Sequence, residues 1–161
     1  MVRRSALLAL TAAFVIPATT AAQQHAEKSS VIVEVPAKSV KWAPANIPGL
    51  VPGMEMAVIS GNPEVEGRPY TMRLRLPAGY AFPAHWHPND ENVTVLSGTF
   101  FVAMGAKTDP AALKKYLPGD YLLMPASMPH FGRVEGETVL QLHGIGPFDL
   151  KVIEEIPGAR K

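Results

Sequence analysis

The sequence predicts a single all-β domain, a barrel or a sandwich of short strands. Two observations lead to this fold class. Several short segments alternate between apolar and polar residues, and thirteen glycines and sixteen prolines interrupt the 161-residue chain at frequent intervals. Hydrophobic residues make up 47% of the chain and charged residues 18%, which is typical of a globular protein with one core.

The first 22 residues are predicted to be a secretory signal peptide. Arg3 and Arg4 precede an apolar run over residues 6–16, and small residues follow up to Ala22, in the order that a signal peptide requires. A retained membrane anchor is the weaker interpretation, because this run is much shorter than the about twenty residues that span a bilayer. We therefore expect cleavage after Ala22, a periplasmic or secreted protein, and no membrane contact afterwards.

The mature chain is expected to have three parts: an N-terminal arm over residues 23–53, one barrel domain over residues 54–156, and a tail over residues 157–161. In the arm, residues 31–35 alternate and are predicted to form an edge strand, because Pro36 cannot donate a ladder hydrogen bond. The chain has no cysteine, so no disulfide contributes to its stability. The net charge of +1, without a basic run, gives no reason to expect a nucleic-acid partner.

Residues 54–59 and 70–76 are predicted to be strands. In the second, large apolar side chains occupy alternate positions, with Thr71, Arg73 and Arg75 between them. The simpler interpretation places both arginines on a solvated face. Arg73 is also a candidate pocket residue, because a guanidinium that reaches into a cavity can bind a carboxylate with two parallel hydrogen bonds.

The second half of the chain predicts one short connector helix, over residues 108–116, between further strands. Asp109 can cap this helix, and Pro110 suits its first position. In the later strand over residues 139–143, Gln141 and His143 share one face. If that face points into the barrel, both are pocket candidates. If it points outward, they are ordinary polar strand residues, and the pattern leaves both interpretations open. The remaining predicted strands are residues 99–104, 121–124 and 150–153.

Residues 79–98 contain the strongest candidate for a functional site. His85 and His87 stand two positions apart, so on a strand their side chains point to the same face. Residues 88–90 are turn formers, and a tight reversal there would bring Glu91 beside both histidines on one hairpin. Two imidazoles and a carboxylate suit iron, manganese or zinc. The alternative is a surface hairpin whose histidines share no role; it is less favoured, because two of only five histidines fall here beside a carboxylate.

The spacing of these residues resembles the two conserved motifs of the cupin superfamily. The first motif is matched at every position, by Gly79, His85, His87, Glu91 and Gly98. The second is matched by Gly119, Pro125 and His130. It departs from the usual pattern at Ser127, where glycine is usual, and at Val134, where asparagine is usual. The chain is thus similar to small, single-domain, metal-binding cupins, here with a signal peptide.

The resemblance implies a double-stranded β-helix, that is, a jelly-roll barrel, with an N-terminal arm and one short connector helix. It also implies four metal ligands, namely His85, His87, Glu91 and His130. The implied cofactor is a divalent ion, Fe²⁺, Mn²⁺ or Zn²⁺, with Ni²⁺ or Cu²⁺ as further candidates. The apolar side chains expected to wall the site are those of Phe82, Met72 and Met124. Because cupin N-terminal strands often lie across a neighbouring subunit, a homodimer is one implied arrangement, and an arm beside its own barrel is the other.

Three classes of function follow from this ligand set. The first is a small-molecule metalloenzyme of the dioxygenase or isomerase kind, because four ligands leave two positions of an octahedral ion for substrate. The second is an extracytoplasmic binding or sensing module that takes up a metal-linked ligand without converting it. The third is a protein whose metal is mainly structural. We favour the enzyme, with a small molecule as the partner, and no motif separates a dioxygenase from an isomerase.

Overall fold

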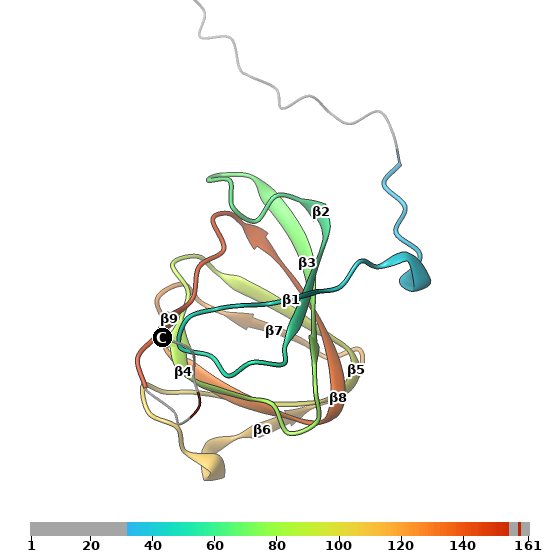
Figure 1. Cartoon of the computed structure of the whole chain (residues 1–161). Coiled ribbons are helices and arrows are strands. Elements are labelled where there is room, and N and C mark those ends of the chain that lie inside the picture. The colour runs from blue at the N-terminus through green and yellow to red at the C-terminus, as the bar shows by residue number, and fades with distance from the viewer. Residues whose placement is uncertain (1–31, 155–157, 159–161) are drawn as a thin grey trace, which may run out of the picture. The chain divides into compact units, whose positions relative to one another are not determined.

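The computed structural model describes residues 32–154 and Gly158 (Figure 1). The predicted signal peptide, the start of the arm and most of the tail lie outside the described residues, so these predictions and the expected domain boundaries stay predictions. The chain's contacts divide it into residues 1–32 and residues 33–161, and the fold below is that of the second unit. Within the described range, no helix combines the length and the apolar character that crossing a membrane requires.

The described residues form an almost entirely β structure, a sheet that curls on itself (Figure 1). All pairings in it are antiparallel, and the strand order is β1-β2-β3-β8-β4-β9, with β5 pairing with β6, β7 and β8. The strands are β1 (Ala43–Pro44), β2 (Glu55–Gly61), β3 (Pro69–Leu76), β4 (Ala81–Trp86), β5 (Glu91–Met104), β6 (Lys114–Tyr116), β7 (Tyr121–Met124), β8 (His130–Ile145) and β9 (Lys151–Val152). Two single 3-10 turns, η1 (Ala37–Ser39) and η2 (Pro110–Ala112), complete the described elements.

The two longest strands, β5 and β8, pair along most of their length, and the other strands pair around them. The other edge of β8 pairs with β3 and β4, and the other edge of β5 pairs with β6 and β7. The β5 ladder is interrupted around Gly98, which has a φ of 79°. A Cβ at this position would collide with the Glu137 carbonyl oxygen and with Thr138. Glycine is therefore required here, both for the backbone conformation and for the close approach of the two strands.

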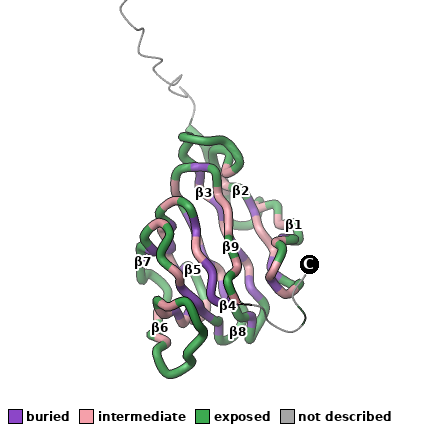
Figure 2. The backbone as a smooth tube through the Cα atoms, turned by 90° about the vertical axis from the view of Figure 1, so that its left-hand side faces the viewer, coloured by how far each residue is buried: buried purple, intermediate pink, exposed green. Residues whose placement is uncertain are grey.

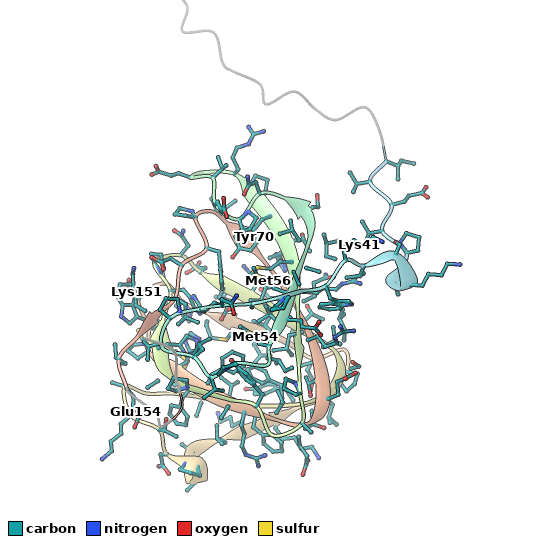
Figure 3. All side chains as sticks on the ribbon, in the orientation of Figure 1. Lys41, Met54, Met56, Tyr70, Lys151 and Glu154 are labelled. Carbon is teal, nitrogen blue, oxygen red and sulfur yellow. The ribbon has the colours of Figure 1, made fainter. Side chains whose placement is uncertain are left out.

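The core lies on the inner faces of the strands. Tyr70, Met72, Leu74 and Leu76 of β3 are buried while the residues between them are half-buried, which confirms the predicted alternation. The alternation of buried and more exposed residues is visible along the strands in Figure 2. Met54 and Tyr70, both buried, belong to the same core (Figure 3). The inner faces of β5 and β8 add Val93, Val95, Leu140 and Leu142.

The described part of the arm packs on its own barrel. β1 pairs with β2, and Ala45 and Leu50 of the following loop are buried in the core. The edge strand predicted for residues 31–35 is not formed over its described residues, 32–35, where Ile32 is 81% and Val33 63% exposed. These residues have no partner strand, and an alternating pattern alone cannot supply the missing ladder hydrogen bonds.

The connector helix predicted over residues 108–116 is only the 3-10 turn η2. Asp109 caps it as expected, because its Oδ1 accepts a hydrogen bond from the Ala111 amide, and Pro110 begins the turn. From Lys114 onward the chain is extended and pairs with β5 as β6, with Tyr116 opposite Phe100. The open edge of β5 thus provides backbone partners that a short helix with little apolar surface would not have.

Candidate metal centre

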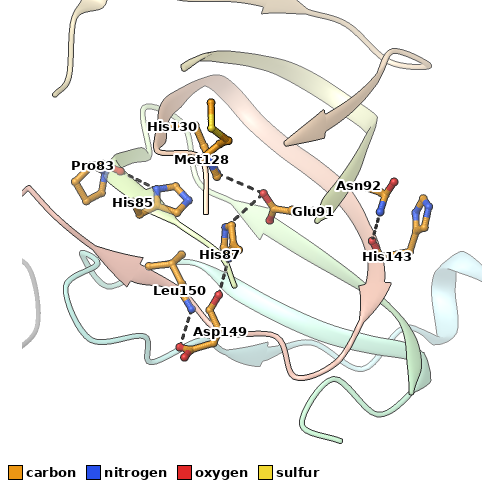
Figure 4. Close-up of polar contacts among 10 residues, drawn as sticks. All are labelled: Pro83, His85, His87, Glu91, Asn92, Met128, His130, His143, Asp149 and Leu150. Atoms are coloured by element: carbon orange, nitrogen blue, oxygen red, sulfur yellow. Dashed lines mark hydrogen bonds and ion pairs between the residues drawn. The ribbon is translucent and has the colours of Figure 1, made fainter. Parts of the chain in front are cut away.

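The three histidines and the glutamate come from the ends of three strands. His85 is near the end of β4, His87 follows this strand, Glu91 begins β5, and His130 begins β8 (Figure 4). His85 and His130 are paired opposite each other across β4 and β8. The sequence pattern suggested a hairpin here, but β4 and β5 do not pair with each other. β4 pairs with β8 and β9 instead, and residues 87–90 connect β4 to β5.

All four side chains are buried and converge on one point. His85, His87, Glu91 and His130 are 5%, 4%, 7% and 3% exposed. One potential ligand nitrogen from each of the three histidines lies within 4.8 Å of the others. Glu91 Oε2 lies 3.4 Å from His87 Nε2 and 3.5 Å from His130 Nε2. The structure therefore brings together the residues that the two sequence motifs single out.

Backbone carbonyls fix the orientation of each imidazole. Nδ1 of His85 lies 2.7 Å from the Pro83 oxygen, Nδ1 of His87 lies 2.7 Å from the Asp149 oxygen, and Nδ1 of His130 lies 3.1 Å from the Met128 oxygen (Figure 4). A carbonyl oxygen can only accept, so each Nδ1 carries the proton and donates it. In the neutral rings, each Nε2 is consequently left with a free lone pair, which is the usual state of a metal-binding histidine.

The Nε2 atoms of His87 and His130 are buried and have no hydrogen-bond partner among the described residues. Both face the same Glu91 carboxylate oxygen, so lone pairs face a negative charge unless a proton or a metal ion lies between them. Two ligand atoms that are each about 2.1 Å from a shared ion are about 3.0 Å apart at octahedral angles and about 3.4 Å apart at tetrahedral angles. The observed separations of 3.4 and 3.5 Å fit a shared ion. The residues present therefore fit the divalent metal that the sequence motifs imply.

Electrostatics favour the protonation states that a metal requires. Burial, followed by the nearby His130 ring, lowers the pKa of His85 to about 3, so this imidazole is neutral at physiological pH. Burial alone would raise the pKa of Glu91, but the nearby imidazoles of His130, His87 and His85 outweigh it, and the pKa is lowered. The cluster thus holds at least one neutral imidazole beside an ionised carboxylate.

The cluster faces a small cavity of about 30 Å³ inside the barrel. Phe82 and Met124 line the cavity as expected, whereas Met72 is buried in the core without lining it. Apart from the four clustered side chains and Gly132, all lining residues are apolar. They are Ile47, Met54, Leu74, Phe82, Val93, Phe100, Val102, Met124, Phe131, Leu140, Leu142, Phe148 and Leu150.

The other pocket candidates do not line this cavity. Leu140 and Leu142 of β8 do, and Gln141 and His143 lie on the opposite face of that strand. Gln141 Oε1 accepts a hydrogen bond of 3.0 Å from Arg73 Nε, across the β3–β8 pair. The His143 ring stacks on Tyr121, with 6.5 Å between ring centroids, and is exposed. Arg73, Gln141 and His143 therefore lie on the outer surface of the sheet.

Sequence reasoning missed the segment between β8 and β9. Phe148 stacks on the His87 ring, with 5.3 Å between centroids, and its neighbour Asp149 supplies the carbonyl that orients His87. Leu150 lines the cavity, as does Ile47 from the loop after β1. No residue type here signals a site, because the contributions are one backbone carbonyl and three apolar side chains.

The loop before His130 explains one departure from the cupin pattern. Ser127 has a φ of 60°, the left-handed conformation that glycine adopts without strain, and its amide donates a 2.7 Å hydrogen bond to the His87 carbonyl. Val134, the other departure, is 1% exposed and belongs to the core. Both substitutions are accommodated without moving His130 from the cluster.

The curled antiparallel barrel and its buried cluster of three imidazoles and a carboxylate are the features of a jelly-roll protein with an internal metal-binding site. Residues 72–146 match the family model described as a cupin domain. The resemblance to the cupin superfamily and the expected fold are both confirmed. No curated protein sequence shows significant similarity to it.

Solved structures with the same fold include proteins of several kinds. The polyketide cyclase RemF from Streptomyces resistomycificus has a TM-score of 0.62 at 16% identity, covering 80% of this chain and 89% of that one. An RmlC-like cupin from Shewanella frigidimarina has a TM-score of 0.52 at 16% identity, covering 69% and 87%. Salicylate 1,2-dioxygenase from Pseudoaminobacter salicylatoxidans, solved with gentisate adducts, has a TM-score of 0.52 at 19% identity, covering 63% and 29%. At these identities the likeness concerns the fold alone.

Proposed function

We propose that this protein is an exported metalloenzyme that binds one divalent ion through His85, His87, Glu91 and His130 and oxidises a small molecule with dioxygen. The observation that carries the metal assignment is the pair of buried, unpartnered Nε2 atoms that face the Glu91 carboxylate. Three neutral nitrogens and one carboxylate would leave a net charge of +1 on a divalent site, which attracts an anionic oxygen of a substrate.

The chain's own residues have distinct roles in this proposal. The carbonyls of Pro83, Asp149 and Met128 hold the three imidazoles with Nε2 toward the ion. The apolar cavity lining excludes bulk water from the site. A bound ion supplies Lewis acidity and brings dioxygen next to an electron-rich substrate.

The cavity lining favours a dioxygenase over an isomerase. An isomerase that moves a proton on its substrate needs a general base within hydrogen-bond reach. Outside the four proposed ligands, no lining side chain in the described part of the chain can accept or donate a proton. A dioxygenase adds both atoms of dioxygen to its substrate, and this overall reaction releases no proton that a separate base would have to accept. Salicylate 1,2-dioxygenase, which shares the fold, is a member of this class.

A non-catalytic binding or sensing module is the second candidate. The small size of the cavity, about 30 Å³, favours it, because there is room for about two water-sized groups but not for a substrate in this conformation. The two functions separate by turnover. We would measure dioxygen consumption and product formation by metal-reconstituted protein with a panel of catechols, enediols and diketones.

A dioxygenase consumes dioxygen in proportion to substrate, and a chelator abolishes this consumption. A binding module changes its spectrum on adding the ligand without consuming dioxygen, which would contradict the enzymatic proposal. A structural metal would show neither response, and its removal would only lower the thermal stability.

Export is part of the proposal and has a separate test. Arg3, Arg4 and the apolar run over residues 6–16 support a cleaved signal peptide. Expression of the full chain in a bacterial host, followed by fractionation and N-terminal sequencing, should find protein in the periplasm that begins at Gln23. Protein that stays in the cytosol and keeps residues 1–22 would contradict export without affecting the metal site.

A further inference from the structure

A groove of about 640 Å³ lies on the outside of the barrel beside the cavity of the metal centre. It is formed by the loop after β1 and by the segment that leads into β9, over residues 46–49 and 148–152 together with Met56. Ile47, Phe148 and Leu150 line both the groove and the inner cavity. These three half-buried side chains separate the groove from the cavity, and we call them the wall.

We propose that Phe148 is the specificity-determining residue of the wall, and that the substrate is a compact apolar molecule that binds the metal through its own oxygen atoms and enters past Phe148 from the groove. This inference rests on the proposed function, because it names the substrate class and the size limit of the same site.

The chemistry of the cavity determines the substrate class. Every lining side chain other than the proposed ligands is apolar, so a ligand finds hydrogen-bond or ionic partners only at the metal and its ligands. Each additional buried hydroxyl without a partner costs about 1–3 kcal/mol. Carbohydrates and other polyols are therefore disfavoured. An aromatic ring or short hydrocarbon with one or two adjacent oxygens fits, because its body is apolar and its oxygens face the ion.

The size of the cavity makes the wall decisive. A volume of about 30 Å³ holds about two water-sized groups, so a ligand larger than this requires a wall side chain to move. Phe148 is the wall residue in direct contact with a proposed ligand, because its ring stacks on His87. Rotation of this ring would uncover His87 while the neighbouring Asp149 carbonyl remains bonded to the imidazole.

Of the two places where the cavity meets an outer groove, the wall is the one that lies outside the strand ladders. A second outer groove, of about 490 Å³, meets the cavity at Val102 and Met124, but both residues are held in strand ladders of β5 and β7. Phe148 and Leu150 instead lie in the irregular segment between β8 and β9, and Ile47 lies in a loop. Local opening is cheapest where few ladder hydrogen bonds must break, which favours the wall as the entrance.

The test follows ligand binding on Co²⁺-loaded protein by stopped-flow absorbance, and thus does not depend on turnover. The probes are azide, 4-nitrocatechol and tartrate, which are a small anion, an aromatic with two adjacent oxygens, and a chelator with a polar body. Phe148→Ala should raise the association rate constant for 4-nitrocatechol at least about ten-fold and change that for azide less than about two-fold. In this variant, tartrate should bind at least about ten-fold more weakly than 4-nitrocatechol.

Phe101→Ala is the matched control. Phe101 is also a half-buried phenylalanine, but it packs under the Arg133 guanidinium at 4.1 Å and lines neither the cavity nor either groove. Its removal should leave both rates unchanged. Metal content is measured for every variant, and if Phe148→Ala holds less metal than wild type, Phe148→Leu and Ile47→Ala replace it, with a smaller increase expected.

Three results would overturn the proposal. Equal 4-nitrocatechol rates in wild type and in the wall variants would show that the wall does not limit access. Acceleration by Met124→Ala instead would place the entrance at the second groove. Tartrate that binds as tightly as 4-nitrocatechol would contradict the apolar substrate class. If wild-type protein binds no Co²⁺, the proposed function itself fails, and that failure is seen before any probe is added.

Discussion

The carboxylate of Glu91 faces the lone pair of His130, with 3.5 Å between Oε2 and Nε2, and no hydrogen-bond donor satisfies the buried nitrogen. The Met128 carbonyl holds the only proton of the neutral ring on the other nitrogen, Nδ1. This relationship is unfavourable without a positive charge between the two atoms. It is the reason why the cluster is better explained by a bound cation than by hydrogen bonding within the core.

Replacement of Glu91 should therefore have opposite effects on the metal-bound and metal-free protein. Glu91→Gln keeps the shape of the side chain but removes its charge, so we expect metal affinity to fall at least about ten-fold. Without metal, the variant should be as stable as metal-free wild type or more stable, because it no longer buries a carboxylate that has no cation beside it. Competition with a chromophoric chelator measures the first effect and thermal unfolding the second. Glu135→Gln, an exposed site on β8, is the control, and unchanged affinity in Glu91→Gln would contradict the fourth ligand.

The metal-free protein should lose stability as the pH falls. Burial and the neighbouring imidazoles lower the pKa of His85 from 6.5 to about 3, so between these values the unfolded state binds more protons than the folded state. The free energy of unfolding then rises with pH and falls on acidification from about pH 6.5. The lowered pKa of Glu91 acts in the same direction below its unfolded value of 4.5. Urea unfolding with chelator from pH 7.5 to 4.5 measures the slope.

His85→Gln should flatten this pH dependence, because it removes the group with the larger proton-binding difference in that range. His143→Gln is the control, since that histidine is exposed on the outer face of β8. A wild-type stability that does not change between pH 6.5 and 4.5 would show that His85 is not held neutral by the fold.

Gly98→Ala should destabilise the barrel by at least about 2 kcal/mol, because a Cβ is strained at this φ and also collides with the adjacent β8 backbone. Gly136→Ala separates the two causes. Its φ of 71° is similar, but a Cβ there would meet no atom within 4 Å. Thermal unfolding should show a clearly smaller loss of stability for Gly136→Ala than for Gly98→Ala. Equal losses would mean that the collision with β8 does not contribute to the effect of Gly98→Ala.

Ser127→Gly should stabilise the protein by about 0.5–1 kcal/mol. Ser127 adopts the left-handed conformation, its side chain is exposed, and glycine removes the strain at that φ. Ser97→Gly, in β5, is the comparison, because glycine at a strand position without a positive φ should destabilise. Denaturant unfolding of both variants measures the difference, and a loss of stability in Ser127→Gly would contradict the strain.

The sequence predicted the parts of the fold that depend on local patterns. The alternation over residues 70–76 is a strand with the expected inner face, and the motif spacing anticipated the convergence of His130 on His85, His87 and Glu91. The connector over residues 108–116 was predicted wrongly, because its capping residues start a 3-10 turn as well as a helix, and the open edge of β5 decided the outcome.

The site's surroundings depend on contacts that no local pattern reports. The pattern that made Gln141 and His143 pocket candidates says only that they share a face, and pairing with β3 places that face outside. The Asp149 carbonyl orients His87 through a backbone group, so the residue type carries no signal. Phe148 belongs to the site because the segment after β8 turns back over the barrel, which is a tertiary relationship.

The most direct test of the account is the metal content of wild-type protein, His130→Ala and His143→Ala, each purified after expression of the full chain and measured by elemental analysis. We predict about one divalent ion per chain in wild type and in His143→Ala, and far less than one in His130→Ala. The metal found in wild type also decides whether redox chemistry is available. If His130→Ala keeps the full metal content, or if wild type binds none, the central claim that these four residues hold one ion is contradicted.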